Sequence, residues 1–470
     1  MRAYNHQVSE LLATPYSPPR AAVGSGWRLD KLFTVSTVVA LLGFHAVLGL
    51  VAEAAPVVAT VHGILVGGTL LVLAAVSKRV DRIFAITVYA SLCDLFWRMT
   101  GSKAPWEFSK YLLIVGSVAI LLRFARPWTR AAIPITFLAC LVPGLVMTVM
   151  SNGVVEGKDQ IADFGLGAIA LGVAVLAFRQ LVISETEGWN LGWIMLAPIM
   201  TALAITLRSS LRLGVDAFNG ESSFAATGGF GPNQVSSALG LGILICVLLA
   251  LQRRGAQYLG ILVGLGFLLT WATFVTFSRG GLYTVVIAGG ALLLVGVWSR
   301  GHRFRSGVTI AVAVVGLFMM YSSVNDFSGS WLDTRYEGGN RAEATTGRSD
   351  LVEQDVGIFL AHPIWGVGIG GSDRYHRLAG HVDPVTHTEQ ARLLAEHGLF
   401  GLTGIGLLLA MAVGGFRESR SQWNRMFVVA TFAWGFTTML HAATRLGAVS
   451  LLIALSQLRI EPDTGQRARR

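Results

Sequence analysis

Apolar stretches long enough to cross a lipid bilayer recur along most of this chain, separated by short polar segments. A spanning helix needs about 20 mostly apolar residues to cross a hydrocarbon core about 30 Å thick. Hydropathy predicts about fourteen spans, or twelve if the short third and last ones do not cross fully. The predicted spans are 32–52, 56–77, 82–97, 109–125, 131–150, 163–184, 190–208, 235–252, 256–277, 281–299, 307–322, 399–415, 425–441 and 445–459.

These spans divide the chain into five parts. The prediction is an N-terminal tail (1–31), a membrane bundle of about eleven spans (32–322), one long polar loop (323–398), the last spans (399–459) and a C-terminal tail (460–470). The loop is expected to contain short helices and to hold the active site.

Composition supports a polytopic all-α membrane protein. Hydrophobic residues make up 53% of the 470 residues and charged residues only 14%, against about 25% in an ordinary soluble domain. Cys93, Cys140 and Cys246 all lie inside apolar runs, so they are predicted to be buried free thiols.

The distribution of charge predicts topology. The net charge of +10 is spread in small basic groups between spans, which argues against nucleic acid as a partner. All of these groups fall on one side of the membrane if fourteen spans are assigned, and the positive-inside rule makes that side cytoplasmic. Both termini are then cytoplasmic, and the loop 323–398 faces outward together with 209–234, 278–280 and the turn at His441–Arg445.

Two helices are expected inside the long loop. The first begins near Arg348 and is stopped by Pro363. Thr346 and Ser349 are candidate caps for it. Its predicted buried face comprises Val352, Val356, Phe359 and Leu360. A glycine-rich turn, "WGVGIGGSD", follows at 365–373; it lacks the strand–turn–helix setting of a dinucleotide site.

The second loop helix is expected over 387–397. Thr386 and Glu389 form a capping-box pattern, and Gly398 stands at the C-cap position. Ala391, Leu394 and Ala395 are predicted to form its buried side. His387 would occupy the first helical position, where the helix dipole favours a neutral, proton-accepting imidazole. The alternative is an exposed histidine in a capping turn.

Arg279 stands between two apolar spans with almost no loop to hold it. An arginine at membrane depth costs about 2.5–3.5 kcal/mol on insertion scales, so such residues usually face a polar cavity. The alternative is an arginine that snorkels to the interface. Gly280 and Gly281 would allow backbone or ligand to approach closely.

Arg279, Arg348 and His387 together suggest an extracytoplasmic pocket. Two guanidinium groups can clamp a phosphate-containing group, and a neutral histidine can deprotonate an incoming hydroxyl. Such a set suits displacement of a diphosphate from an activated lipid. The loop histidines 362, 376, 381, 387 and 397 fit no compact metal-ligand spacing, so no metal site and no cofactor is expected.

The order of these motifs resembles the bacterial family of O-antigen ligases and O-antigen or exopolysaccharide polymerases. The resemblance rests on "SRGG", "TGRSDLVEQDVGIFLAHPIWGVGIG" and "HTEQARLLAEHGLFGL", covering about 278–402. "GGFGPNQVSSALG" at 228–240 is similar to the family's Gly-x-x-Asn entry into a span. Thr388 departs from the asparagine that commonly follows the family's histidine.

The resemblance implies a metal-independent, inverting glycan transferase of the bacterial inner membrane, with its active loop periplasmic or extracellular. The donor would be a glycan on undecaprenyl diphosphate, and the acceptor a hydroxyl of another glycan or lipid, as in lipopolysaccharide or exopolysaccharide synthesis. Membrane lipids and other polysaccharide-export proteins are candidate partners. The implied catalytic residues are Arg279, Arg348 and His387. Asn233, His441 and Arg445 are further candidates for substrate binding.

Two other functions stay open from sequence. A transporter or flippase of lipid-linked sugars would carry charges within several spans, and Asp94 and Arg98 in the third span fit that reading. A one-turn ion pair within a helix is the simpler explanation of those two residues. A purely structural membrane protein would leave the charged loop without a role.

Overall fold

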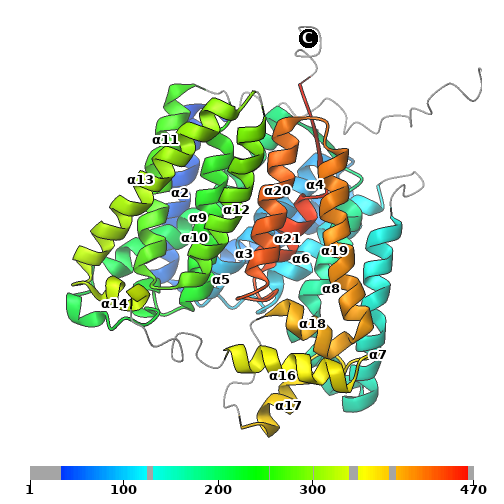
Figure 1. The fold of residues 1–470 in the computed structure, drawn as a ribbon. Helices are drawn as coiled ribbons and strands as arrows, with labels where there is room; N and C mark the ends of the chain where they lie inside the picture. Colours follow the sequence, from blue (N-terminus) through cyan, green and yellow to red (C-terminus); the bar gives the residue numbers. More distant parts are fainter. Residues whose placement is uncertain are drawn as a thin grey trace, which may run out of the picture.

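The computed structural model describes residues 33–123, 131–252, 255–299, 301–337, 348–380 and 388–463. The described chain is a bundle of helices with several shorter helices at one end (Figure 1). Its helices are α2 (Val35–Ala54), α3 (Pro56–Val76), α4 (Val80–Leu92), α5 (Asp94–Met99), α6 (Phe108–Leu121), α7 (Ala132–Gln160), η2 (Ile161–Gly165), α8 (Leu166–Phe178), α9 (Glu185–Ser210), η3 (Val215–Ala217), η4 (Ala225–Thr227), α10 (Pro232–Ala250), α11 (Ala256–Val275), α12 (Arg279–Trp298), α13 (Arg303–Phe327), α14 (Trp331–Glu337), α16 (Arg348–Ala361), α17 (Ser372–Leu378), α18 (Glu389–His397), α19 (Leu399–Glu418), α20 (Gln422–Thr438) and α21 (Gly447–Leu455).

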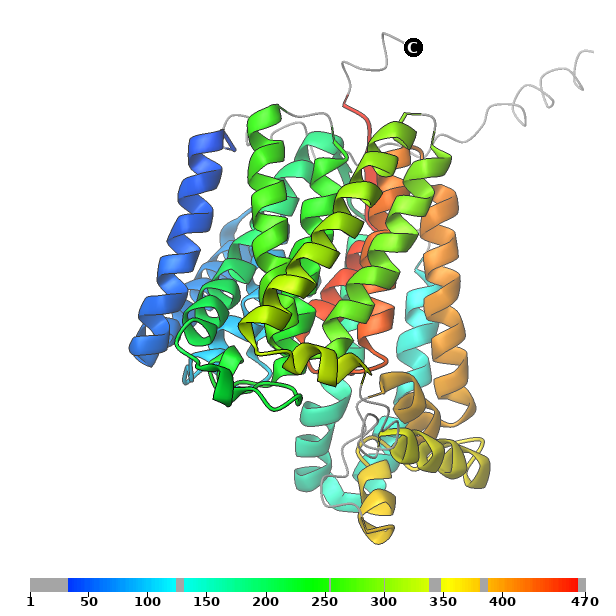
Figure 2. The same cartoon turned by 60° about the vertical axis from the view of Figure 1, so that its left-hand side comes forward.

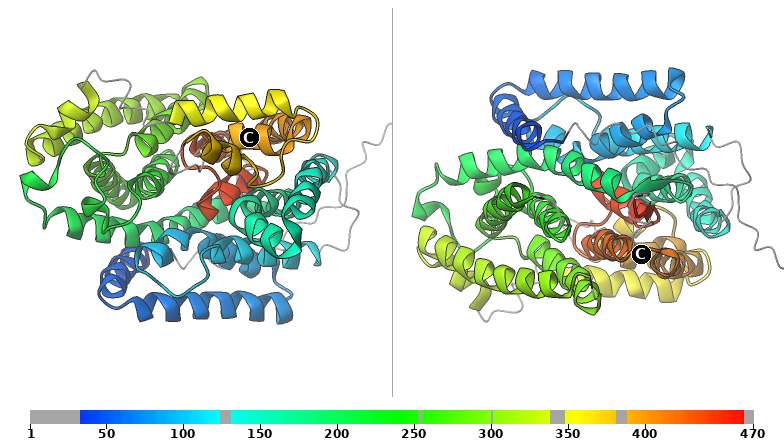
Figure 3. Two further views of the ribbon diagram at one scale, coloured as in Figure 1. Left: turned by 90° about the horizontal axis from the view of Figure 1, so that it is seen from below. Right: turned by 90° about the horizontal axis from the view of Figure 1, so that it is seen from above.

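Nine helical segments of the described residues are long and apolar enough to cross a membrane, which confirms an all-α polytopic membrane protein. They are α2, α3, the run Ala132–Phe178, α9, α10, α11, α12, α13 and α19. Exposed apolar side chains such as Val314 and Phe318 line α13, as expected where a helix faces lipid. In contrast, all of α21 is buried (Figure 3).

The long run Ala132–Phe178 contains two of the predicted spans. Gly153 lies inside it with φ 78° and ψ 173°, a conformation that suits glycine and breaks the helix. Asn152 Nδ2 donates to Gln160 Oε1 at 2.9 Å across the bend. Figure 2 shows the two halves as a hairpin that extends below most of the bundle, as do α16 and α17.

The remaining predicted spans coincide with shorter helices. The third is divided at Cys93 into α4 and α5, while α6, α20 and α21 have 14, 17 and 9 residues. Because these helices are below ordinary spanning length, the count of fourteen stays a prediction. All three cysteines are free and buried, as expected.

A short parallel pair of strands was not predicted. β1 (Val182–Ser184) pairs with β2 (Arg459–Glu461), with Ile183 opposite Ile460. The predicted spans 163–184 and 445–459 therefore end too late, because the last residues of each are extended or turn rather than helical. The pair ties the chain after α21 to the start of α9, at the end of the bundle opposite α16, α17 and α18 (Figure 1).

The first loop helix, α16, begins at Arg348 and ends before Pro363 as predicted, but its predicted buried face is wrong. Val356 and Leu360 are 40% and 71% exposed, and the buried positions are Leu351, Asp355 and Ile358. The helix is turned this way because Asp355 pairs with His376 of α17 at 2.9 Å, with both side chains fully buried. Thr346 lies outside the described residues.

The second loop helix begins later than predicted, at Glu389 rather than at residue 387. Thr388 is extended, because its hydroxyl donates to Leu440 O at 3.0 Å and the Glu389 N–H donates to Met439 O at 2.7 Å. Thr386, the other member of the predicted capping box, lies outside the described residues; the Glu389 carboxylate accepts hydrogen bonds from Arg392. Gly398 is the C-cap as expected.

Candidate active site

An asparagine, a histidine and a threonine from separate segments meet at the end of the bundle where α12 begins. Asn233 Nδ2 donates to the His441 carbonyl at 2.6 Å, and Asn233 Oδ1 lies 3.0 Å from His441 Nδ1. His441 Nε2 lies 2.7 Å from the Thr284 hydroxyl. Because Oδ1 can only accept, a neutral His441 carries its proton on Nδ1 and presents Nε2 to Thr284 as an acceptor.

The two glycines after Arg279 make this meeting possible. A Cβ on Gly280 would lie 2.5 Å from Asn233 Oδ1 and 2.7 Å from His441 Nδ1. A Cβ on Gly281 would lie 2.3 Å from the Ser236 backbone. The close approach expected of these glycines is therefore between protein segments, α12 against α10 and the turn after α20.

Arg279 is the first residue of α12 at this same end. It follows Phe277, whose φ of 56° lies in the left-handed region that non-glycine residues rarely adopt. Burial raises the pKa of Tyr336 in α14 to about 12; Tyr283 adds to this, while Arg279 and Arg335 oppose it. Arg279 is thus close enough to α14 to act on its tyrosine.

The chain next to His387 joins the same region. Thr388 and Glu389 are bonded to the carbonyls of Leu440 and Met439, directly before His441. His387 itself lies outside the described residues, as does the side chain of Arg348, so their approach to Arg279 stays a prediction. Arg445 belongs to the turn 439–446 that carries His441, and its own N–H donates to Ala442 O at 3.4 Å.

The helix α18 carries three buried charges, of which the sequence predicts a role only for Glu389, as part of a capping box. Arg392 pairs with Glu389 at 2.8 Å and lies 3.8 Å from Glu396, and all three side chains are nearly inaccessible. Ala391 and Ala395 are buried as predicted, while Leu394 is only partly so. The spacing of Glu389, Arg392 and Glu396, three and four residues apart, is the sequence pattern that could have predicted this ion-pair cluster.

The glycine-rich turn fits around the end of α18 and serves packing. Gly366, Gly368 and Gly370 all have positive φ, and a Cβ on Gly366 would lie 2.4 Å from the backbone of Glu396. The Gly370 N–H donates to the Glu396 carboxylate at 2.8 Å. Burial raises the pKa of Glu396 to about 8, against the opposing effects of Arg392 and of this hydrogen bond.

Three of the five loop histidines are described, and each has a local environment that accounts for it. His376 pairs with Asp355, and His362 Nε2 lies 3.1 Å from the Tyr375 hydroxyl. His397 packs its ring against Gly144 of α7, where a Cβ would approach to 2.4 Å. Burial and the Arg392 charge lower the pKa of His397 to about 4.

Comparison with known proteins finds a family that matches the part of the chain containing α12, α16 and α18. Residues 264–406 match the family model described as O-antigen ligase. The match includes Arg279, Arg348 and His387, whereas Asn233, His441 and Arg445 lie outside it. No curated protein matches the chain. The match therefore supports the O-antigen ligase family for the part of the chain at 264–406.

Proposed function

We propose that this protein transfers a glycan from a polyprenyl-diphosphate donor to a hydroxyl of an acceptor glycan or lipid, on the outer face of the bacterial inner membrane. The family domain supports a membrane glycan-transferring ligase or polymerase in general. The observation that carries the proposal is the pair of contacts between Asn233 and His441 beside Gly280. These contacts bring the start of α12 next to the turn 439–446, and the chain beside His387 is bonded to the same turn.

The proposed roles follow from the chemistry of each group. Arg279 and Arg348 bind the diphosphate through their planar guanidinium groups. His387 takes the proton of the acceptor hydroxyl as its oxygen attacks the anomeric carbon. The bond from that carbon to the phosphate oxygen breaks, and the polyprenyl diphosphate leaves. His441, oriented by Asn233 and Thr284, and Arg445 line the acceptor or diphosphate side of the site.

An apolar cavity supports a lipid-linked donor. It has a volume of about 680 Å³ and lies between α10, α11, α12 and α13, lined on α12 by residues from Val285 to Val297. At 1.5 Å per residue, these positions lie about 9 to 27 Å along α12 from Arg279. The hydrocarbon core is about 30 Å thick, so only a long chain headed at Arg279 would reach most of the cavity.

A transporter is less well supported. Arg98 pairs with Asp94 at 3.0 Å and lies 3.6 Å from Glu107, which also pairs with Lys110. These buried charges balance one another within one cluster. They do not form a series of charges along several spans, which is what a transport path would need.

Reconstitution tests the proposal directly. The protein in liposomes with a polyprenyl-diphosphate oligosaccharide should release polyprenyl diphosphate and form a new glycosidic bond. His387→Ala should lower this transfer by about 10²-fold or more, the usual contribution of a general base. His362→Ala is the matched control, because His362 lies in the same loop and its ring contacts Tyr375.

The outcome also separates the two activities of the family. Growth of the glycan on the lipid would identify a polymerase, and transfer to a second molecule would identify a ligase. Full transfer by His387→Ala would contradict the assigned base, and translocation of the intact donor without bond exchange would contradict transfer altogether.

A further inference from the structure

The turn 439–446, between α20 and α21, carries both His441 and Arg445 and has a strained backbone. Ala443 has a φ of 51°, in the left-handed region. Such a conformation persists only where surrounding contacts hold it in place. The groups that hold this turn therefore help to fix the orientation of His441 and Arg445.

A buried carboxylate binds the turn on one side. The Thr444 N–H donates to Glu389 Oε2 at 3.1 Å, and Glu389 is paired with Arg392. Arg392 is fixed in turn by a 2.7 Å hydrogen bond from its Nη2 to Phe164 O. This side of the turn is thereby joined to α18 and to the segment before α8.

A second buried carboxylate, Asp94, binds the chain where the turn ends. Asp94 Oδ2 accepts the N–H of Gly447, the first residue of α21, at 2.9 Å. That N–H has no partner within its own helix, and a carboxylate at a helix N-terminus is favoured by the helix dipole. Gly447 allows the approach, because a Cβ there would lie 2.6 Å from Ser109 Oγ.

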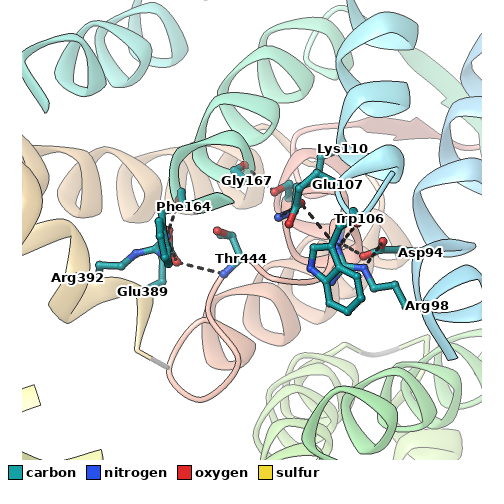
Figure 4. A network of polar contacts seen from close by, with 12 residues as sticks. Asp94, Arg98, Trp106, Glu107, Lys110, Phe164, Gly167, Glu389, Arg392 and Thr444 are labelled. Carbon is teal, nitrogen blue, oxygen red and sulfur yellow. Dashed lines mark hydrogen bonds and ion pairs between the residues drawn. The ribbon is translucent and has the colours of Figure 1, made fainter. Parts of the chain in front are cut away.

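Asp94 is itself held by a cluster that neutralises it. Its other oxygen, Oδ1, lies 3.0 Å from Arg98 Nε. Arg98 donates to Trp106 O at 2.8 Å and stacks 4.5 Å over the Trp106 ring. Glu107 and Lys110 complete the cluster with their own ion pair. Figure 4 shows this cluster and the Glu389–Arg392 pair on opposite sides of Thr444.

We propose that Asp94, oriented by Arg98, is a positioning residue for the active site: it fixes the end of the turn 439–446 and thereby the placement of His441 and Arg445. The expected effect on glycan transfer rests on the proposed function, whereas the expected effect on the structure of the turn does not. It gives the buried charges of the third predicted span a role in transfer in place of a role in transport.

The informative substitution is Asp94→Asn. The two carboxylate oxygens have different partners: Oδ1 forms the ion pair with Arg98, and Oδ2 accepts the N–H of Gly447. An asparagine keeps the shape but has only one accepting oxygen, so one of these two partners loses its acceptor. Asp81→Asn is the matched control: Asp81 is also buried and paired, with Arg79 at 2.7 Å, but it lies at the opposite end of α4.

Two measurements test the proposal. Amide hydrogen exchange of 440–447, followed in lipid nanodiscs, should become about tenfold faster or more in Asp94→Asn, the scale expected for losing a hydrogen bond to a charged group. It should be unchanged in Asp81→Asn. Transfer should fall through kcat, and adding Asp94→Asn to the double variant His441→Ala, Arg445→Ala should lower transfer by no more than about a further twofold, because Asp94 acts through these two residues.

Unchanged exchange over 440–447 in Asp94→Asn would overturn the proposal, as would a full further loss of transfer when Asp94→Asn is added to the His441→Ala, Arg445→Ala variant. If wild-type protein shows no transfer, the proposed function fails while the exchange result still tests the positioning. Should Asp94→Asn fail to insert, Arg98→Lys tests the same link, because a lysine cannot reach Asp94 and Trp106 O together; it too must accelerate exchange in 440–447.

Discussion

Asn233 binds His441 at two points, donating to its carbonyl at 2.6 Å and facing its ring Nδ1 at 3.0 Å. One side chain thus fixes both the backbone position and the ring orientation of a residue 208 positions further along the chain. The asparagine of "GPNQ" is accordingly placed to orient a histidine, and its effect on substrate would pass through that ring.

We expect Asn233→Ala to lower transfer by about 10- to 100-fold, because removing a partner that orients an active-site histidine commonly has effects of this size. The measurement is kcat in liposomes with a polyprenyl-diphosphate oligosaccharide. Asn424→Ala is the control, since Asn424 is a buried asparagine at the end of α20 that lies away from His441. Equal losses in the two variants would indicate a general effect on stability.

Arg279→Lys should lower kcat/KM for the donor by about tenfold or more, because an ammonium group cannot reproduce the planar fork that binds a diphosphate at two points. Arg303→Lys is the matched control: each arginine is the first residue of a long apolar helix, but they lie at opposite ends of the bundle. Wild-type kinetics in Arg279→Lys would mean that charge alone suffices.

Gly290→Leu should fill part of the cavity between α10 and α13. Among the described residues, no atom outside the neighbouring backbone of α12 lies within 4 Å of a Cβ at Gly290, so the change adds bulk without a clash. The KM for a donor with a long polyprenyl chain should rise about tenfold, since each methylene that stays unburied loses about 0.8 kcal/mol. A short-chain donor should be unaffected.

Gly406→Leu is the control for the cavity, because Gly406 is equally uncrowded and lies outside it. The test compares the same two donors with both variants. A KM change of equal size for short and long chains would show that the cavity does not hold the lipid chain.

The buried Glu396 predicts a loss of stability as pH rises. Its pKa is raised from 4.5 to about 8, so between these values the folded protein holds a proton that the unfolded chain lacks, and its stabilisation is lost as pH rises through 8. His397 acts in the opposite direction, because its pKa is lowered to about 4 and its contribution is lost as pH falls from 6.5.

Between pH 6.5 and 8, Glu396 is the one of these two groups that still changes the free energy of unfolding. The free energy of unfolding, measured in detergent, should therefore fall over this interval in the wild-type protein. Glu396→Gln cannot ionise and should show a flatter profile there. The two proteins would have parallel profiles if Glu396 were ionised throughout.

The sequence by itself determined the membrane class of the fold, most of the helices and their order, because spanning length and hydropathy are local properties of each segment. It also placed the start of α16 at Arg348 and the close approach at Gly280 and Gly281. These features depend on neighbouring residues or on the absence of a side chain.

Only the tertiary structure decided which polar groups are buried together. Asp355 turns α16 toward His376, Glu389 pairs with Arg392 and accepts from Thr444, and Asp94 reaches Gly447 across 353 positions of sequence. Periodicity assigns a charged side chain to the polar face of its own helix. A buried charge instead needs an opposite charge or a free backbone N–H close in space, and that partner is supplied by the packing of distant segments.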